Sequence, residues 1–91
     1  MPRVVLTAEV DNLATWEQGF RTHGDLFRQM GVSSMEYCTS EGNRVAVCGD
    51  TTDLDAYMKV LDSPATAEAM AGDGVKRETV RVFVLDKTLT V

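Results

Sequence analysis

The segment that decides the fold of this chain reads DNLATWEQGFRTHGDLFRQMG, residues 11–31. The Asp-Asn pair at its start can accept hydrogen bonds from free backbone N–H groups, and Gly31 suits the left-handed position that ends a helix. At about 100° per residue the apolar and aromatic side chains fall in one stripe, with charged side chains on the opposite face. We therefore predict a single amphipathic helix here. The members of its inner stripe are Leu13, Trp16, Phe20, His23, Phe27 and Met30.

Two glycines lower the intrinsic stability of this predicted helix. Gly19 and Gly24 each cost about 1 kcal/mol of helix propensity relative to alanine. The helix is therefore expected to depend on the packing of its aromatic stripe against the rest of the fold.

Strand-like sequence flanks the helix on both sides. Residues 3–10 alternate loosely and are rich in β-branched residues, as is typical of a strand. Residues 32–39 and 44–48 also read as strands, and the sequence Glu-Gly-Asn at 41–43 between them tolerates a tight reversal. We predict a first strand over residues 3–10, followed after the helix by a hairpin.

The second half of the chain contains two helix starts and a last strand. Thr52 followed by Asp55 imitates a capping box, so a second helix is predicted to start there. Ser63 and Pro64 restart a short helix that runs through about Ala71, because serine caps well and proline is tolerated in a first turn. Glycines at 72 and 74 end that helix, and residues 77–85 alternate cleanly as a final strand.

The predicted order of elements is β-α-β-β-α-β. This order is the ferredoxin-like α+β arrangement, a four-stranded antiparallel sheet with the helices on one face. Right-handed crossovers place the strands in the spatial order 4-1-3-2. Because no internal repeat, linker or low-complexity segment interrupts the sequence, residues 1–91 are expected to form a single domain.

The other face of the sheet is expected to be apolar whichever register the strands adopt. In the last strand the valines of one alternating set oppose Phe83 and Leu85 of the other, and in the first strand Val5 opposes Val4 and Leu6. A large apolar face on a small monomer marks an interface, and a self-complementary face gives a two-fold dimer. We therefore predict a homodimer whose sheets stack face to face.

Composition argues against several classes of function. Nine Lys and Arg against 14 Asp and Glu give a net charge of −5 at pH 7, so neither nucleic acid nor an anionic membrane is an expected partner. The apolar runs are far shorter than the roughly 20 residues that cross a bilayer, and no signal-peptide core is evident, so a mature soluble chain in the cytoplasm is expected.

Cys38, Cys48 and a single histidine predict free thiols and no metal site. No glycine-rich loop precedes a helix, so no nucleotide cofactor is predicted.

These segments together resemble a known superfamily. The spacing of Trp16, Phe20 and His23, the hairpin, and above all the segment SPATAEAMA at residues 63–71 resemble small proteins of the dimeric α+β barrel superfamily. The chain is similar, more distantly, to antibiotic-biosynthesis-type monooxygenases and stress-responsive barrel proteins. The resemblance spans nearly the whole chain and implies two paired ferredoxin-like subunits, each with a small-molecule pocket between helices and sheet. Haem-degrading relatives use an Asn, a Trp and a His, but Trp16 and His23 lie on one helix here, so those roles are not carried over.

His23 is the candidate catalytic residue. It is the only imidazole of the chain and lies inside the aromatic stripe, where its environment can tune it as an acid or a base near neutral pH. The alternative is a core histidine with one hydrogen-bond partner. Three aromatic rings and a histidine overfill a narrow gap between helix and sheet unless some of them border a cavity. The predicted ligand-binding residues are Trp16, Phe20, His23, Phe27, Tyr37 and Tyr57.

The tyrosines and two strand arginines are further candidate site residues, and each also has a purely structural explanation. The tyrosines offer hydroxyl groups to a buried site, but each is equally an amphipathic ring at the edge of a core. Arg44 and Arg81 are candidates for holding an anion, whereas strand arginines near a sheet edge usually only cover it.

Three functions remain open from the sequence. The main hypothesis is a protein that binds a small hydrophobic or aromatic molecule. The second is a cofactor-free oxygenase or isomerase in which His23 removes a proton from a phenolic or enolic substrate and Tyr37 or Tyr57 stabilises the anion. The third is a structural or interaction module, which requires no cavity beside His23.

Overall fold

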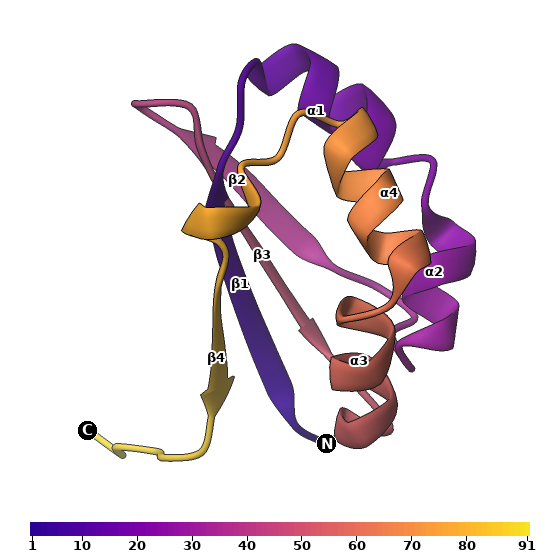
Figure 1. Cartoon of the computed structure of the whole chain (residues 1–91). Coiled ribbons are helices and arrows are strands. Elements are labelled where there is room, and N and C mark those ends of the chain that lie inside the picture. The colour runs from indigo at the N-terminus through magenta and orange to yellow at the C-terminus, as the bar shows by residue number, and fades with distance from the viewer.

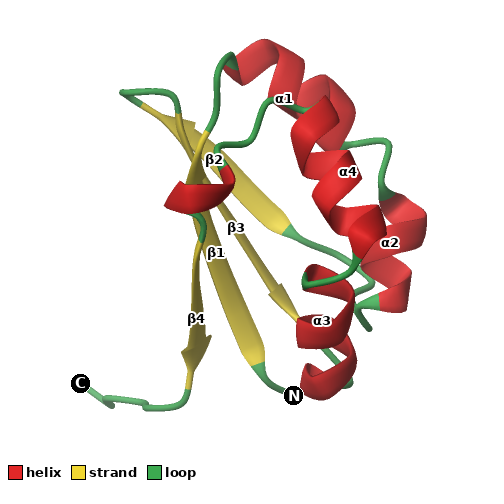
Figure 2. Cartoon of the chain, in the orientation of Figure 1, coloured by secondary structure: helices red, strands yellow, loops and turns green.

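The computed structural model describes all 91 residues as a two-layer arrangement of helices on a sheet. Figure 1 shows the α-helices grouped on one side of the strands, and Figure 2 separates the same layers by secondary structure. In chain order the elements are β1 (Arg3–Glu9), α1 (Leu13–Phe20), α2 (Gly24–Gln29), β2 (Glu36–Ser40), β3 (Arg44–Asp50), α3 (Leu54–Leu61), α4 (Pro64–Gly72), the 3₁₀ helix η1 (Arg77–Thr79) and β4 (Arg81–Leu85).

The strands form one antiparallel sheet in the order β2-β3-β1-β4. This order confirms the predicted ferredoxin-like α+β fold and its strand arrangement. β1 is central, and its Val5 lies opposite Cys48 of β3 on one side and Phe83 of β4 on the other. Because side chains alternate across a strand, the buried Val4 and Ala8 of β1 face the helices, whereas Val5 faces away from them.

The prediction of one helix over residues 11–31 is wrong, because the chain divides into α1 and α2. The Thr22 hydroxyl donates a hydrogen bond to the Gly19 carbonyl oxygen at 2.6 Å, and such a local bond competes with continued helix. His23 then occupies the N-cap position of α2. The expected weakness at Gly19 and Gly24 therefore marks the place of the break. Gly31 follows α2 in the left-handed conformation, with φ of 78°, as predicted.

Side chains cap three of the four α-helices at their N-termini. Asn12 accepts a hydrogen bond from the Thr15 backbone N–H at the start of α1, and Ser63 caps α4 as predicted. The capping box predicted at Thr52 is wrong. Asp53 holds the N-cap position of α3 instead, because its carboxylate accepts the Ala56 backbone N–H at 3.0 Å.

The predicted strand bounds also need correction. Residues 32–35 precede β2, because the Val32 backbone N–H donates to the Phe27 carbonyl oxygen at 3.0 Å and holds the chain against the end of α2. β3 runs on to Asp50. Residues 77–79 form η1 rather than the start of the last strand, since the Thr79 N–H donates locally to the Lys76 carbonyl oxygen at 2.9 Å.

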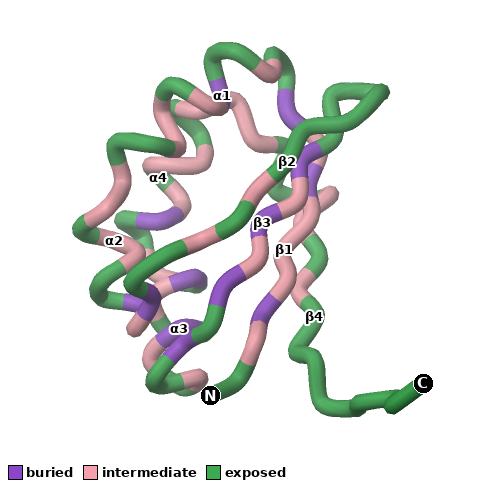
Figure 3. Tube along the Cα trace, turned by 180° about the vertical axis from the view of Figure 1, so that it is seen from behind, coloured by how far each residue is buried: buried purple, intermediate pink, exposed green.

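The core between the two layers consists of two hydrophobic clusters and is thin. Only 13 of the 91 residues are buried, so the helical layer covers the sheet without a deep interior. Leu6 and Met35 pack against both clusters and join them. Figure 3 shows buried positions alternating with more exposed ones along β1 and β3. The clusters contain Val4, Met30, Val32, Tyr57 and Leu61 in one, and Ala8, Val10, Trp16, Val45 and Val47 in the other.

The rear face of the sheet, the side that no helix covers, has an apolar centre and charged ends. At one end the Arg3 guanidinium bonds Glu36 at 2.7 Å and Asp50 at 3.3 Å, and these hydrogen bonds raise the pKa of Arg3. Phe83 and Leu85 are each 53% exposed. Arg44 and Glu9 carry opposite charges at the other end, so the predicted large apolar face is confined to the part between these charged ends. By strand alternation that part consists of Val5, Ala46 and Cys48 on the two central strands and Phe83 on the edge strand β4, while Leu85 lies opposite Arg3 at the charged end.

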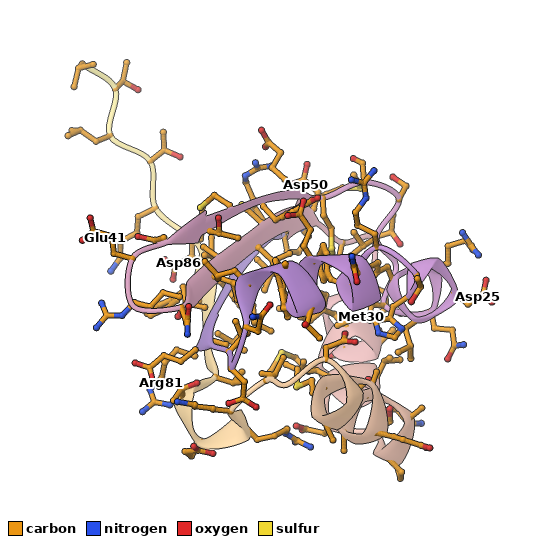
Figure 4. All side chains as sticks on the ribbon, turned by 90° about the horizontal axis from the view of Figure 1, so that it is seen from above. Asp25, Met30, Glu41, Asp50, Arg81 and Asp86 are labelled. Atoms are coloured by element: carbon orange, nitrogen blue, oxygen red, sulfur yellow. The ribbon has the colours of Figure 1, made fainter.

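The segment after β4 runs away from the sheet. Residues 86–91 have no regular secondary structure and are exposed. Figure 4 shows this segment extending past Asp86, and shows Asp25, Glu41 and Arg81 at the periphery of the molecule. None of the helices has the length and apolar character needed to cross a bilayer.

Candidate functional site

A cavity lies between the helices and the sheet, where the two core clusters meet. Its volume is about 80 Å³, and 15 of the 18 residues that line it are hydrophobic. The sheet contributes Leu6, Ala8, Val45 and Val47 to its floor. The three exceptions to this apolar wall are His23, Thr66 and Asp73.

Aromatic rings from α1 and α2 form one wall of the cavity. Trp16 and Phe20, one turn apart on α1, stack with ring centroids 4.7 Å apart and planes inclined by 22°. Phe20 also packs on Phe27 of α2 at 5.1 Å, so the rings hold the two helices together across the break. All three line the cavity. The aromatic stripe therefore continues across the break between α1 and α2 and borders the cavity.

His23 has a partner that the sequence analysis did not identify. Its Nε2 lies 2.8 Å from the Oδ2 atom of Asp73, and the two residues are 50 positions apart in the chain. Both side chains are largely shielded from solvent, with 25% of His23 and 13% of Asp73 exposed. Both also line the cavity. A titratable pair of this kind on an otherwise apolar wall is the main polar feature of the site.

Gly19 makes room for this pair. A Cβ atom placed on Gly19 would lie 2.6 Å from the carboxyl carbon of Asp73, closer than real contacts allow. The carboxylate of Asp73, at the C-terminal end of α4, therefore rests directly on the backbone of α1. The sequence pattern gave Gly19 only a cost in helix propensity, whereas the structure gives it a steric role.

The two predicted tyrosines occupy different positions. Tyr57 of α3 is buried and lines the cavity, and its burial raises the pKa of its hydroxyl, so the hydroxyl stays protonated at neutral pH. Tyr37 of β2 does not line the cavity. Its ring packs edge-on against Trp16 and Phe20, and its hydroxyl donates to a carboxylate oxygen of Glu17 at 2.7 Å, which raises the pKa of Tyr37.

Five of the six predicted ligand-binding residues therefore lie on one cavity: Trp16, Phe20, His23, Phe27 and Tyr57. Tyr37 supports the aromatic wall from behind. Asp73 was not predicted as a site residue, because a single Asp between two glycines is typical of a turn. Its closeness to His23 depends on how the end of α4 packs against α1, and no local sequence pattern indicates that packing.

The same side chains do not assemble a metal centre. No group of three or more His, Cys, Asp or Glu side chains lies close enough together to hold a metal ion. Cys38 and Cys48 are free thiols and do not line the cavity. Proton transfer and binding of apolar groups are therefore the chemistry that the lining residues themselves can provide.

The fold and the cavity define a class of small ferredoxin-like α+β proteins with a hollow between helices and sheet. No protein-family model matches the chain, and no curated protein matches it in sequence. Solved structures whose names describe antibiotic biosynthesis monooxygenases or a cofactor-independent oxygenase share its fold, which agrees with the predicted ferredoxin-like arrangement.

Three of these structures illustrate the likeness. A candidate antibiotic biosynthesis monooxygenase from Bordetella bronchiseptica is 19% identical with a TM-score of 0.74, and the match covers 97% of each chain. SnoaB, a cofactor-independent oxygenase from Streptomyces nogalater, is 20% identical with a TM-score of 0.70, covering 99% of this chain and 95% of SnoaB. A candidate monooxygenase from Deinococcus radiodurans is 13% identical with a TM-score of 0.67, covering 100% and 96%. At these identities the likeness establishes the fold alone.

Alkaline pH is expected to destabilise the protein through Tyr57. An exposed tyrosine in the unfolded chain ionises near pH 10, whereas burial keeps folded Tyr57 protonated to higher pH. Above about pH 10 the unfolded state binds fewer protons, so the free energy of unfolding falls as pH rises towards the folded pKa. Urea unfolding at neutral pH and above pH 10 measures this loss, which should shrink in Tyr57→Phe. A Tyr57→Phe variant with the full alkaline loss would contradict the assignment.

Proposed function

We propose that this protein binds a small aromatic or hydrophobic molecule in the cavity beside His23. The observation that carries the proposal is the apolar lining of the cavity, interrupted at one end by the pair His23 and Asp73. Ligand pockets combine such an apolar wall with a few placed polar groups. An apolar hollow with a polar end selects a ligand with one polar group.

The volume of the cavity limits the size of the proposed ligand. About 80 Å³ is several times the space that one water molecule needs. It lies well below the roughly 300–1,000 Å³ of pockets that hold drug-sized ligands. We therefore propose a single-ring ligand. Flexible methionines on the cavity wall, which adapt readily to shape, leave room for modest enlargement; they are Met30, Met35 and Met70.

Binding is testable through Trp16, which is the only tryptophan of the chain and lines the cavity. Addition of 4-nitrotoluene is expected to quench Trp16 fluorescence to saturation. Ala69→Phe, which fills the cavity from α4, should weaken binding by about tenfold or more, whereas Ala65→Phe on an exposed position of the same helix should not. Quenching that stays linear in ligand concentration, or is equal in both variants, would contradict the proposal.

A cofactor-independent oxygenase is the second candidate function. The supporting observation is the place of His23, with a carboxylate partner, on the wall of the cavity. In this proposal His23 accepts the proton of a phenolic or enolic substrate, and the protonated Tyr57 hydroxyl on the same wall donates to the anion that forms. The fold likeness to SnoaB, a cofactor-independent oxygenase, is consistent with this chemistry.

His23→Gln separates the two candidate functions. A binding protein should retain its affinity for 4-nitrotoluene with modest loss and show no oxygen uptake beyond the uncatalysed rate. An oxygenase should show oxygen uptake with hydroquinone as probe, and the variant should lose about 10² or more of that rate, as expected for removal of a general base. Oxygen uptake that is unchanged in His23→Gln would exclude His23 as the base.

We further propose that two copies of the chain pair through the rear face. The proposal is supported by the exposed Phe83 and Leu85 of β4 on this face and by charges of both signs at its two ends. An exposed apolar patch framed by polar residues is typical of an interface.

Cys38 and Cys48, both free thiols, support a reducing compartment such as the cytoplasm as the proposed location.

Sedimentation at micromolar concentration is expected to give twice the 10.0 kDa mass of the chain. Phe83→Asp places a charge in the apolar part of the rear face and should shift the protein to a folded monomer. Met58→Asp, at an exposed position on the helical side, is the matched control and should remain dimeric. A wild-type protein that sediments as a stable monomer would overturn the pairing.

A further inference from the structure

We propose that Asp73 is the positioning residue for His23: it accepts the Nε2–H proton and leaves Nδ1 to receive a proton from a ligand hydroxyl. The inference rests on the proposed function, because it concerns the same cavity and assigns the direction of proton transfer within it. It also names the ligand class more closely, as a single-ring molecule with an acidic hydroxyl.

The hydrogen bond between the two side chains fixes the tautomer. A carboxylate only accepts hydrogen bonds, so the atom 2.8 Å from Asp73 Oδ2 must carry the proton when the ring is neutral. His23 lies at the N-cap of α2 but makes no side-chain capping bond there. With the proton on Nε2, the Nδ1 atom of the neutral ring is a hydrogen-bond acceptor, and the contact with Asp73 is the one side-chain hydrogen bond of the ring. Tyr57 is the other titratable side chain on the cavity wall, and it faces the cavity protonated.

The position of Asp73 has no simple explanation in the stability of α4. It is the C-cap residue of that helix, and a negative charge at a helix C-terminus faces the negative end of the helix dipole. The same carboxylate requires a glycine on the neighbouring helix, because a side chain at Gly19 would collide with it. The Asp73 carboxylate is therefore unfavourable for the helix dipole of α4 and restricts position 19 of α1. The favourable contact that it makes is the hydrogen bond with His23.

The consequence for chemistry is an oriented acceptor. A carboxylate that holds Nε2–H sets the rotation of the ring and stabilises the imidazolium that forms when Nδ1 takes a proton. The proton moves from the ligand O–H to Nδ1, and the electron pair of the broken bond stays on the ligand oxygen. No oxidant or further reactant is needed for this step.

The first test reads the histidine ring directly by NMR, since the chain has one histidine. In protein labelled with ¹⁵N-histidine, the neutral ring should carry its proton on Nε2, and this proton should exchange slowly with water. Asp73→Ala should speed exchange by about tenfold or more. Gly19→Ala should do the same without touching either charge, since it displaces the carboxylate and improves helix propensity.

Gly72→Ala is the matched control for the glycine substitution. It adds the same methyl group beside Asp73 in sequence, but nothing lies within 4 Å of its Cβ position. Exchange should therefore match the wild type. A wild-type ring with its proton on Nδ1, or an exchange rate that Asp73→Ala leaves unchanged, would overturn the inference.

The second test measures proton transfer to a bound ligand. With 4-nitrophenol as probe, the visible absorbance of the phenolate reports the fraction of bound ligand that has given up its proton. Asp73→Asn keeps the shape of the side chain but removes its charge, so the phenolate fraction should fall by about tenfold or more. Affinity for 4-nitrotoluene, which has no hydroxyl, should stay the same.

The two tests separate failure of this inference from failure of the proposed function. Equal losses of 4-nitrotoluene affinity and phenolate fraction in Asp73→Asn would make Asp73 a wall residue and overturn its positioning role. If neither probe binds the wild-type protein, the proposed function fails, and the NMR measurement still decides whether Asp73 orients His23.

Discussion

The helical layer depends on the turn that separates α1 from α2, in which the Thr22 backbone N–H and hydroxyl both donate to the Gly19 carbonyl oxygen, at 2.9 and 2.6 Å. With the helix stopped there, the chain turns and places His23 at the start of α2, close to the end of α4. Phe20 and Phe27 then meet across the break at 5.1 Å. A continuous helix would keep all these side chains in one straight stripe over the sheet. The bend instead wraps the aromatic wall around the point where the two core clusters meet, which is where the cavity lies.

The two faces of the sheet have different surroundings. The helical side contains the thin core and the cavity, while the rear side presents an apolar part that includes Val5 and Phe83 between charged ends. Because side chains alternate along each strand, one register settles both faces at once: Val4 enters the core because Val5 faces the rear. The proposed binding site and the proposed pairing surface are therefore set by the same strand pairing, on opposite sides of β1.

Sequence periodicity was sufficient to predict the element order and the strand order, because alternation in residues 3–10 and the turn residues around Gly42 are local signals. It was also sufficient to place Trp16, Phe20 and Phe27 on one face. It failed where tertiary contacts decide. The break at Thr22 depends on a side-chain bond that competes with helix, and the cap at Asp53 displaced the expected one by a single residue. Asp73 was invisible because its partner lies 50 positions away.

The contact between Gly19 and Asp73 couples the residue types that two distant positions of the chain can hold. With the carboxylate in place, the first position admits no side chain; with any side chain at the first position, the carboxylate has to withdraw. Displacing the carboxylate breaks its hydrogen bond with His23, whereas loss of the carboxylate leaves space beside Gly19. A side chain at Gly19 is therefore compatible with the fold only where the carboxylate at position 73 is absent or displaced, whereas glycine at position 19 fits either case.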